Sequence, residues 1–226
     1  MTHGRWQRAV VDRRSIVRTI ALGAALLSAG CPASGASGGD GFPSEKTPEG
    51  AYTRVALAIA EGRLVDVFPY LEDEAQWASH TIRKERAAAV ARAERSFPQD
   101  ALAAIVAAYG PDARAVDGAD VFVRIGKARG WFGRLRRDLS GVARAEVDGD
   151  RATIVTARGT RYPMRRRSVG LWGLTSFTAE LLADAERATR DRARVEEAAR
   201  DYDLAAGHAS PPPETQPEKK DGGAGG

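Results

Sequence analysis

Residues 142–166, VARAEVDGDRATIVTARGTRYPMRR, decide the fold class of this chain. Three β-prone runs, at 142–147, 151–157 and 160–166, are separated by Asp148-Gly149 and Arg158-Gly159. An Asp-Gly pair between such runs is typical of a hairpin, because a type I′ turn needs positive φ at both central residues. The stretch therefore predicts a compact antiparallel meander, to which residues 171–174 would add a fourth strand.

The sequence before the meander has helical patterning. Thr47-Pro48-Glu49 supplies an N-cap, a proline in the first turn and a carboxylate facing the helix dipole, and Gly62 ends the predicted helix. Residues 116–126 fit either a strand or a helix, and we favour a helix because Asp117 offers an N-cap. Further helices are expected at 64–71, bent or ended near Pro69, at 74–96, after Pro98 as far as Gly110-Pro111, and at 131–139.

Residues 175–202 predict the longest helix, because apolar side chains recur at steps of three and four. We expect its first half to pack on the sheet and its more charged second half to project. The fold class is therefore α+β: mainly helical, with a small antiparallel sheet of three to four strands and a long C-terminal helix. Trp77, Trp131 and Trp172 are expected to anchor the core.

The N-terminus has the pattern of an export signal. Five arginines, including Arg13 and Arg14, precede the uncharged run 19–30, which is mostly Ala, Leu, Ile and Gly. This run has about a dozen residues, whereas a membrane span needs about 20. Small residues then precede Cys31, as a signal peptidase requires. The alternatives are a disordered basic N-terminus with an idle thiol, or an uncleaved anchor helix.

Ala29-Gly30-Cys31 resembles the lipobox of bacterial lipoproteins. That resemblance implies that Cys31 becomes the mature N-terminus and carries acyl chains, which would anchor the protein to a membrane of the cell envelope. Residues 12–18, DRRSIVR, also resemble a twin-arginine export motif through Arg13 and Arg14. Export through the general secretory route stays open, as does the choice between inner and outer membrane.

These patterns divide the chain into four parts: a signal peptide at 1–30, a lipidated cysteine and flexible tether at 31–46, a globular domain at 47–206, and a disordered tail at 207–226. The formal charge is +4, from 34 basic and 30 acidic residues. The signal alone holds five arginines and one aspartate, so the mature chain is formally neutral. Neutrality and export both argue against a nucleic-acid partner.

Basic residues concentrate in the middle of the domain. Residues 114–172 hold 14 Arg or Lys against 6 Asp or Glu, and five of these arginines surround the meander, namely Arg158, Arg161, Arg165, Arg166 and Arg167. One hypothesis is a surface for an anionic lipid headgroup, cell-wall polymer or acidic envelope protein. The alternative, which we favour, is a solvated sheet face paired with the acidic helix that follows.

No pattern indicates catalysis, a metal or a cofactor. The single cysteine is Cys31, and His80 is the one histidine expected inside the domain. Glu72-Asp73-Glu74 could form a site with His80, but carboxylates at a helix start more often stabilise its dipole. The opening of the domain and its hairpins resemble the NTF2-like (cystatin-like) superfamily, although the long final helix departs from that pattern, so no pocket or catalytic residue is transferred.

We therefore expect a lipid-anchored binding or structural module without catalytic activity. One alternative is an enzyme that processes a small molecule in a pocket between sheet and helices; a deep cavity holding a carboxylate with a strongly shifted pKa would favour it. Another is an assembly protein that pairs through its long C-terminal helix.

Overall fold

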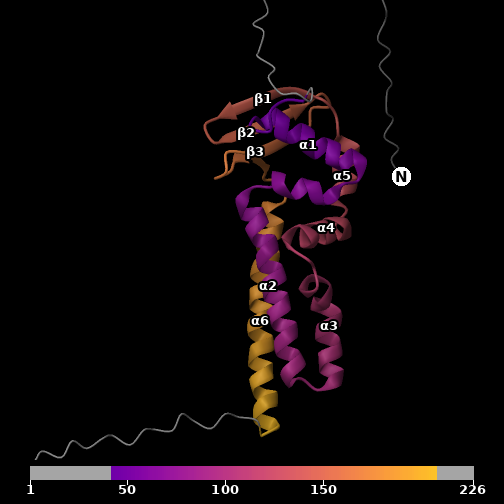
Figure 1. Ribbon diagram of the computed structural model, residues 1–226, viewed down its shortest axis with the longest axis vertical. Helices are drawn as coiled ribbons and strands as arrows, with labels where there is room; N and C mark the ends of the chain where they lie inside the picture. Colours follow the sequence, from indigo (N-terminus) through magenta and orange to yellow (C-terminus); the bar gives the residue numbers. More distant parts are fainter. Residues whose placement is uncertain (1–41, 208–226) are drawn as a thin grey trace, which may run out of the picture. The chain divides into compact units, whose positions relative to one another are not determined.

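The computed structural model describes residues 42–207, which form helices and one antiparallel sheet (Figure 1). The predicted α+β class is confirmed. The predicted signal peptide with Arg13 and Arg14, Cys31, most of the tether and nearly all of the tail lie outside the described residues. In chain order the elements are α1 (Pro48–Glu61), the 3-10 helix η1 (Leu64–Tyr70), α2 (Asp73–Ser96), α3 (Gln99–Ala113), α4 (Gly118–Ala128), α5 (Trp131–Asp138), β1 (Val142–Asp148), β2 (Arg151–Thr156), β3 (Arg161–Arg166), β4 (Trp172–Leu174) and α6 (Thr178–Ala205).

The four strands form the predicted meander, in the order β1-β2-β3-β4, with every neighbouring pair antiparallel. The first turn differs in detail from the prediction. Asp148 pairs with Arg151, so Gly149 and Asp150 are the central residues, and of these only Gly149 has positive φ, at 59°. This is the pattern of a type II′ turn rather than type I′, because glycine at the first central position supplies the one positive φ that type II′ requires.

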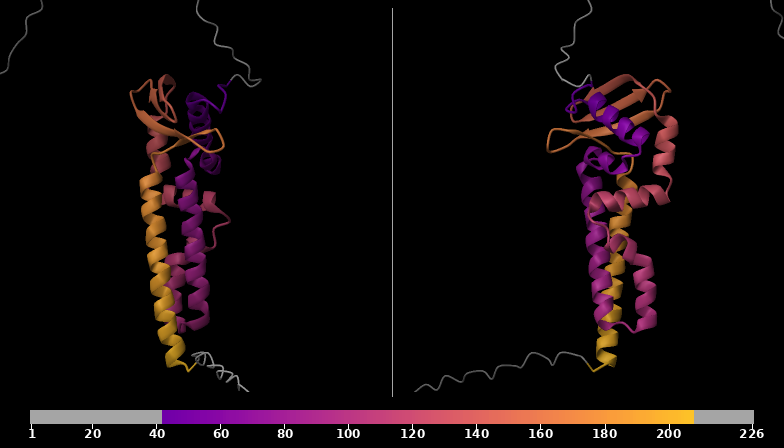
Figure 2. Two further views of the ribbon diagram at one scale, coloured as in Figure 1. Left: turned by 90° about the vertical axis from the view of Figure 1, so that its left-hand side faces the viewer. Right: turned by 45° about the vertical axis from the view of Figure 1, so that its right-hand side comes forward.

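The sheet has one covered face and one face turned to solvent. Helix α1 packs against β1, β2 and β4, as the right-hand view of Figure 2 shows. Its start and end agree with the prediction: Thr47 Oγ1 accepts a hydrogen bond from Gly50 N at 3.1 Å, and Gly62 ends the helix with φ of 76°.

Beneath α1, the buried side chains of β2 and β3 pair as Ala152 with Met164 and Ile154 with Tyr162. Arg144, Glu146, Arg151 and Arg161 are exposed.

Helix α6 lies beside α2 and runs in the same direction, while α3 returns beside α2 (Figures 1 and 2). The expectation that the second half of α6 projects is wrong, whereas Leu181 and Ala185 of its first half belong to the same buried core as the sheet residues Ile154 and Met164. In the second half, Val195 is buried against Ala89 and Ala93 of α2, and Ala199 is buried as well. The reason is that α2 presents small side chains along this face, so two helix backbones can approach closely.

Helix α3 also differs from its prediction. Gly110-Pro111 was expected to end the helix, but α3 continues to Ala113. A proline lacks only its own N–H, and the next turn still closes, since Arg114 N donates to Gly110 O at 3.0 Å. The predicted helix at 116–126 is confirmed as α4, with Asp117 Oδ1 accepting from Asp120 N at 2.9 Å.

The core beneath the sheet is rich in aromatic rings. Phe122 of α4 lies at its centre and contacts the rings of Phe68, Trp131, Phe132 and Phe177. Trp131 and Trp172 are buried, as expected.

Trp77 was expected to be in the core, but 61% of it is exposed. Helix α2 buries Ala75 and Ala78, and position 77 lies about 200° around the helix from position 75.

No helix within residues 42–207 combines the length and the apolar character that a membrane span needs.

Candidate functional site

A cluster of charged side chains forms where strand β4 meets the start of α2. Leu71 bridges to Leu174, and Glu72 N donates to Leu174 O at 3.1 Å. A Cβ on Gly173 would lie 2.5 Å from Glu72 N, so only glycine permits this close approach. The contact brings the end of β3 and the β3–β4 turn onto the acidic residues that open α2.

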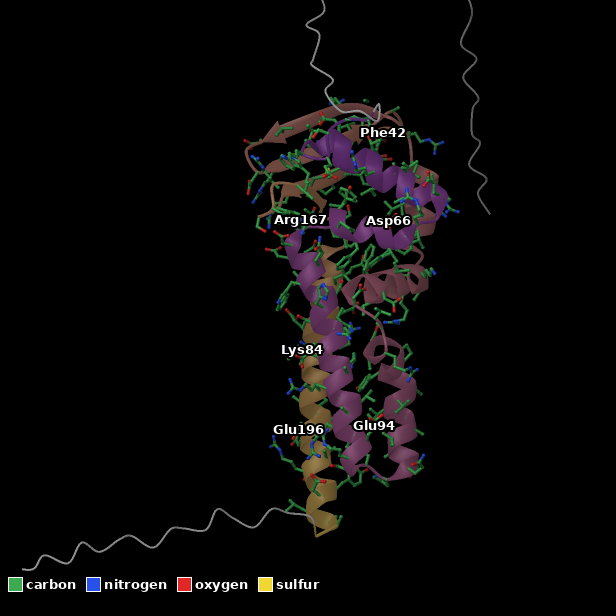
Figure 3. All side chains as sticks on the ribbon, viewed as in Figure 1. Phe42, Asp66, Lys84, Glu94, Arg167 and Glu196 are labelled. Atoms are coloured by element: carbon green, nitrogen blue, oxygen red, sulfur yellow. The ribbon has the colours of Figure 1, made fainter. Side chains whose placement is uncertain are left out.

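The structure divides the five predicted arginines among several places. Arg165 Nη1 lies 3.4 Å from Glu74 Oε1 and 3.6 Å from Glu72 Oε2. Arg167, labelled in Figure 3, donates through Nε to Asp73 Oδ1 at 2.7 Å. Arg166 is exposed and its side chain forms no hydrogen bond or ion pair with the described residues. Together with Glu72, Asp73 and Glu74, these three arginines line a hollow of about 130 Å³.

The other two arginines lie farther along the sheet. Arg161 forms an ion pair with Glu146 of β1, and Arg158 donates to the backbone carbonyl of Arg137. The carboxylates that face the meander arginines thus come from the start of α2 and from β1. We had expected them to come from the helix that follows the sheet, but that helix turns its carboxylates toward α2 and α4. Proximity in the sequence therefore predicted the wrong acidic partner for the meander arginines.

Asp73 is the most heavily hydrogen-bonded carboxylate of this cluster. Its Oδ2 accepts from Ser168 N at 3.0 Å and from Ser168 Oγ at 2.9 Å, in addition to the bond from Arg167. Burial acts to raise the pKa of Asp73, but these hydrogen bonds and the charge of Arg167 outweigh it and hold that pKa below its usual value. The arrangement ties the β3–β4 turn to α2.

His80 does not join these carboxylates in a ligand set. Its ring packs edge-on against Phe68 at 5.7 Å and lies close to Gly118. Within residues 42–207, no group of three or more His, Cys, Asp or Glu side chains is placed to hold a metal ion. The acidic start of α2 faces arginines instead.

A second charged pocket, of about 220 Å³, lies between α2, α3, α4 and α6. Its lining comprises Ile82, Arg86, Asp112, Arg124, Ile125, Ala128, Arg129, Asp184 and Arg187. We call it the inter-helical pocket. The sequence does not reveal it, because its residues come from four segments of the chain. One signal was present: Asp184 is a charged residue on the buried stripe that also holds Leu181, Ala185 and Ala188.

An open apolar depression of about 300 Å³ lies beside α1, η1, α4 and α5. Gly62, Gly126, Gly130 and Phe132 form part of its lining, and Lys127 and Arg136 belong to it as well. Arg136 is held in place, since its Nη2 donates to Ile59 O at 2.9 Å.

Comparison with known proteins adds no further constraint: no protein-family model, curated protein or solved structure matches this chain. Function is therefore inferred from the residues and contacts described above.

Proposed function

We propose that this chain is a lipid-anchored lipoprotein of the bacterial cell envelope whose folded unit is a non-catalytic binding module. One observation carries the proposal: a basic leader, an uncharged run and Ala29-Gly30-Cys31 occur in the order that export and lipidation require. Two or more acyl chains on Cys31 would hold the protein firmly at a bilayer, since each buried methylene contributes about 0.8 kcal/mol.

The point where the chain enters the folded unit supports a defined orientation at that bilayer. Arg54 Nη1 donates to Pro43 O at 2.8 Å, and Thr47 N donates to Ser44 O at 3.0 Å, so this segment is fixed at the start of α1. Phe42 and the sheet lie at one end of the unit, and Glu196 lies toward the other (Figure 3). In the proposal the sheet end faces the bilayer because the tether enters the folded unit there, and the far ends of α2 and α6 point away.

The packing between α1 and the sheet favours a binding module over the enzyme alternative. That alternative requires a deep cavity between sheet and helices, but buried Tyr52, Tyr162 and Met164 fill this interface. The two tyrosine rings are 5.3 Å apart, and Tyr52 donates to Ser140 O at 3.1 Å. Burial, with the nearby Tyr52 and Asp138, raises the pKa of Tyr162 to about 12, so its hydroxyl stays protonated near neutral pH.

Palmitate labelling of the wild type and of Cys31→Ala, followed by membrane fractionation, tests the anchor. We expect the wild type to incorporate label and to sediment with membranes, and the variant to do neither. A native product that retains its first thirty residues, or that bears no fatty acid, contradicts the proposal.

The export route is tested by a double variant, Arg13→Lys with Arg14→Lys, which keeps the charge of the leader. Loss of processing in this variant would indicate the twin-arginine route, whereas unchanged processing would indicate the general secretory route. Both outcomes are compatible with lipidation, so this experiment sharpens the proposal without deciding it.

A further inference from the structure

The inter-helical pocket concentrates guanidinium groups. Its own lining holds four arginines, Arg86, Arg124, Arg129 and Arg187, against the two carboxylates Asp112 and Asp184. Asp184 forms ion pairs with two of them: its Oδ2 lies 2.6 Å from Arg129 Nη2, and its Oδ1 lies 3.1 Å from Arg187 Nη1. Two further carboxylates act from outside the lining, Asp191 on Arg86 at 2.7 Å and Glu180 on Arg129 at 3.2 Å. The excess of positive charge is thus confined to the residues that line the pocket, because the two outer carboxylates balance the arginines from behind.

Arg124 of α4 is the least well satisfied of these arginines. It forms an ion pair with Asp112, yet its Nε is buried and has no hydrogen-bond partner among the described residues. Asp112 Oδ1 is the atom that this ion pair holds against Arg124 Nη2, so Nε is left as the unpaired donor. Buried polar atoms are normally paired, so an unpaired guanidinium N–H beside a pocket indicates that a partner is missing.

The electrostatics of Arg124 agree with this interpretation. Burial, followed by the charge of Arg86, lowers the pKa of Arg124 below its usual value, although the charge of Asp184 acts in the opposite direction. Two cations held close together in a partly desolvated site repel each other, and a bound anion would offset both the repulsion and the loss of hydration. Arg86 is rigidly placed, because its guanidinium also lies 4.0 Å from the centre of the Tyr109 ring.

The rest of the pocket limits the size and character of a ligand. Ile82, Ile125 and Ala128 add apolar surface to the charged wall. Its volume of about 220 Å³ is below the range of roughly 300–1,000 Å³ that is usual for drug-sized ligands. A small molecule with one charged group and a short apolar part would match both features.

We propose that the inter-helical pocket binds a small oxyanion, a carboxylate or phosphate group carried on a short apolar body. Guanidinium groups recognise both oxyanions through paired, charge-assisted hydrogen bonds. In this arrangement Arg124 Nε donates to the ligand, Arg187 closes the exposed side of the pocket, and Ile82, Ile125 and Ala128 contact the apolar part. The inference does not depend on lipid anchoring, which Cys31→Ala tests separately.

Isothermal titration of the full-length protein with inorganic phosphate and with benzoate, at constant ionic strength in chloride, tests this proposal. We expect one-to-one binding of at least one probe, and the tighter probe identifies whether the site takes phosphate or carboxylate. Removing a charged partner should weaken binding about tenfold or more, so Arg124→Gln and Arg187→Gln should each raise the Kd by that factor.

Two further variants keep the proposal falsifiable if Arg124→Gln fails to fold. Ala128→Leu leaves every charge in place and narrows the pocket at an exposed helical position, so it should also weaken binding. Arg190→Gln is the matched control, because Arg190 lies on α6 outside the pocket and, within residues 42–207, its ion-pair partner is Glu186 alone. The proposal is overturned if neither probe binds more tightly than chloride, or if Arg187→Gln and Arg190→Gln weaken binding equally.

Discussion

The aromatic core beneath the sheet and the contact between the second halves of α2 and α6 bury different kinds of side chain. The aromatic core consists of Phe68, Phe122, Trp131, Phe132 and Phe177. The second contact, which we call the alanine seam, consists of Ala89, Ala93 and Val195, and α3 adds the half-buried Leu102, Ile105 and Tyr109 beside it. One region buries large rings and the other buries methyl groups.

This difference determines how each region is stabilised. Burial contributes roughly 25 cal/mol for each Å² of apolar surface, so a ring contributes several times more than an alanine methyl. The alanine seam compensates with ion pairs across the two helices, such as Arg86 with Asp191, Glu85 with Arg192 and Arg92 with Glu196. The seam is therefore expected to respond to steric bulk and to charge, and the aromatic core to loss of volume.

The largest effect is expected in the aromatic core. Trp131 is 1% exposed and stacks on Phe177 with ring centres 4.7 Å apart. Trp131→Ala should lower the free energy of unfolding by about 3–5 kcal/mol, because it removes the ring and leaves a cavity. Trp77→Ala, at an exposed position, should change it by no more than about 0.5 kcal/mol. Urea titration followed by circular dichroism measures both, and equal effects would contradict the assignment of the core.

Excess bulk should disrupt the alanine seam. Ala89 of α2 is fully buried against Val195 of α6, whereas Ala91, also on α2, is exposed. Ala89→Leu should cost about 1–3 kcal/mol through overpacking, and Ala91→Leu should be nearly neutral. If the two variants unfold at the same urea concentration, the helices are not in close contact there.

The ion pairs of the seam should have a smaller effect. Arg86 and Asp191 are both mostly buried, with Nη1 and Oδ2 2.7 Å apart. Asp191→Asn should cost about 1–2 kcal/mol, because it leaves a partly buried guanidinium without its charged partner. Glu186→Gln, which removes an exposed pair with Arg190, should have almost no effect. A loss in Asp191→Asn that is no greater than in Glu186→Gln would show that packing alone holds the seam.

The smallest effect concerns the hydrogen bonds by which Asp73 holds Arg167 and Ser168 of the β3–β4 turn against α2. The folded pKa of Asp73 lies below the ordinary 3.8, so its ionised form contributes stability above that pH, and the contribution is lost as pH falls through the folded pKa. Because Asp73 is nearly half exposed, the contribution should be under about 1 kcal/mol. Thermal unfolding of wild type and Asp73→Asn should show a gap that is constant above about pH 5 and closes below pH 4. A gap that stays constant down to pH 2 would contradict this account.

Local sequence signals predicted most elements of the fold. Thr47, Asp117 and Gly62 act within one turn of their own position, and Gly149 sets a turn through its own φ, so the relevant physics lies within a few residues. Errors arose where the partner was distant. The partner of α6, the exposure of Trp77 and the carboxylates facing Arg165 and Arg167 all depend on which surfaces meet.

The candidate sites divide in the same way. The cluster of arginines around the meander was visible in the sequence, but its pairing with Glu72, Asp73 and Glu74 depends on the contact between β4 and α2. The inter-helical pocket left one trace in the sequence, the charged Asp184 on the apolar stripe of α6, but nothing there links Asp184 to Arg86 or Arg124, which lie on other helices.

The sequence by itself determined the α+β class, the caps and turns of the elements, and the expectation that Cys31 anchors an exported protein. The tertiary structure alone decided that α6 lies along α2, which arginines find carboxylates, and where four helices leave a charged pocket. The physical reason is how far apart in the sequence the interacting residues lie. Backbone dihedrals and capping hydrogen bonds depend on neighbouring residues, whereas packing and ion pairs depend on atoms that only folding brings within a few ångströms of one another.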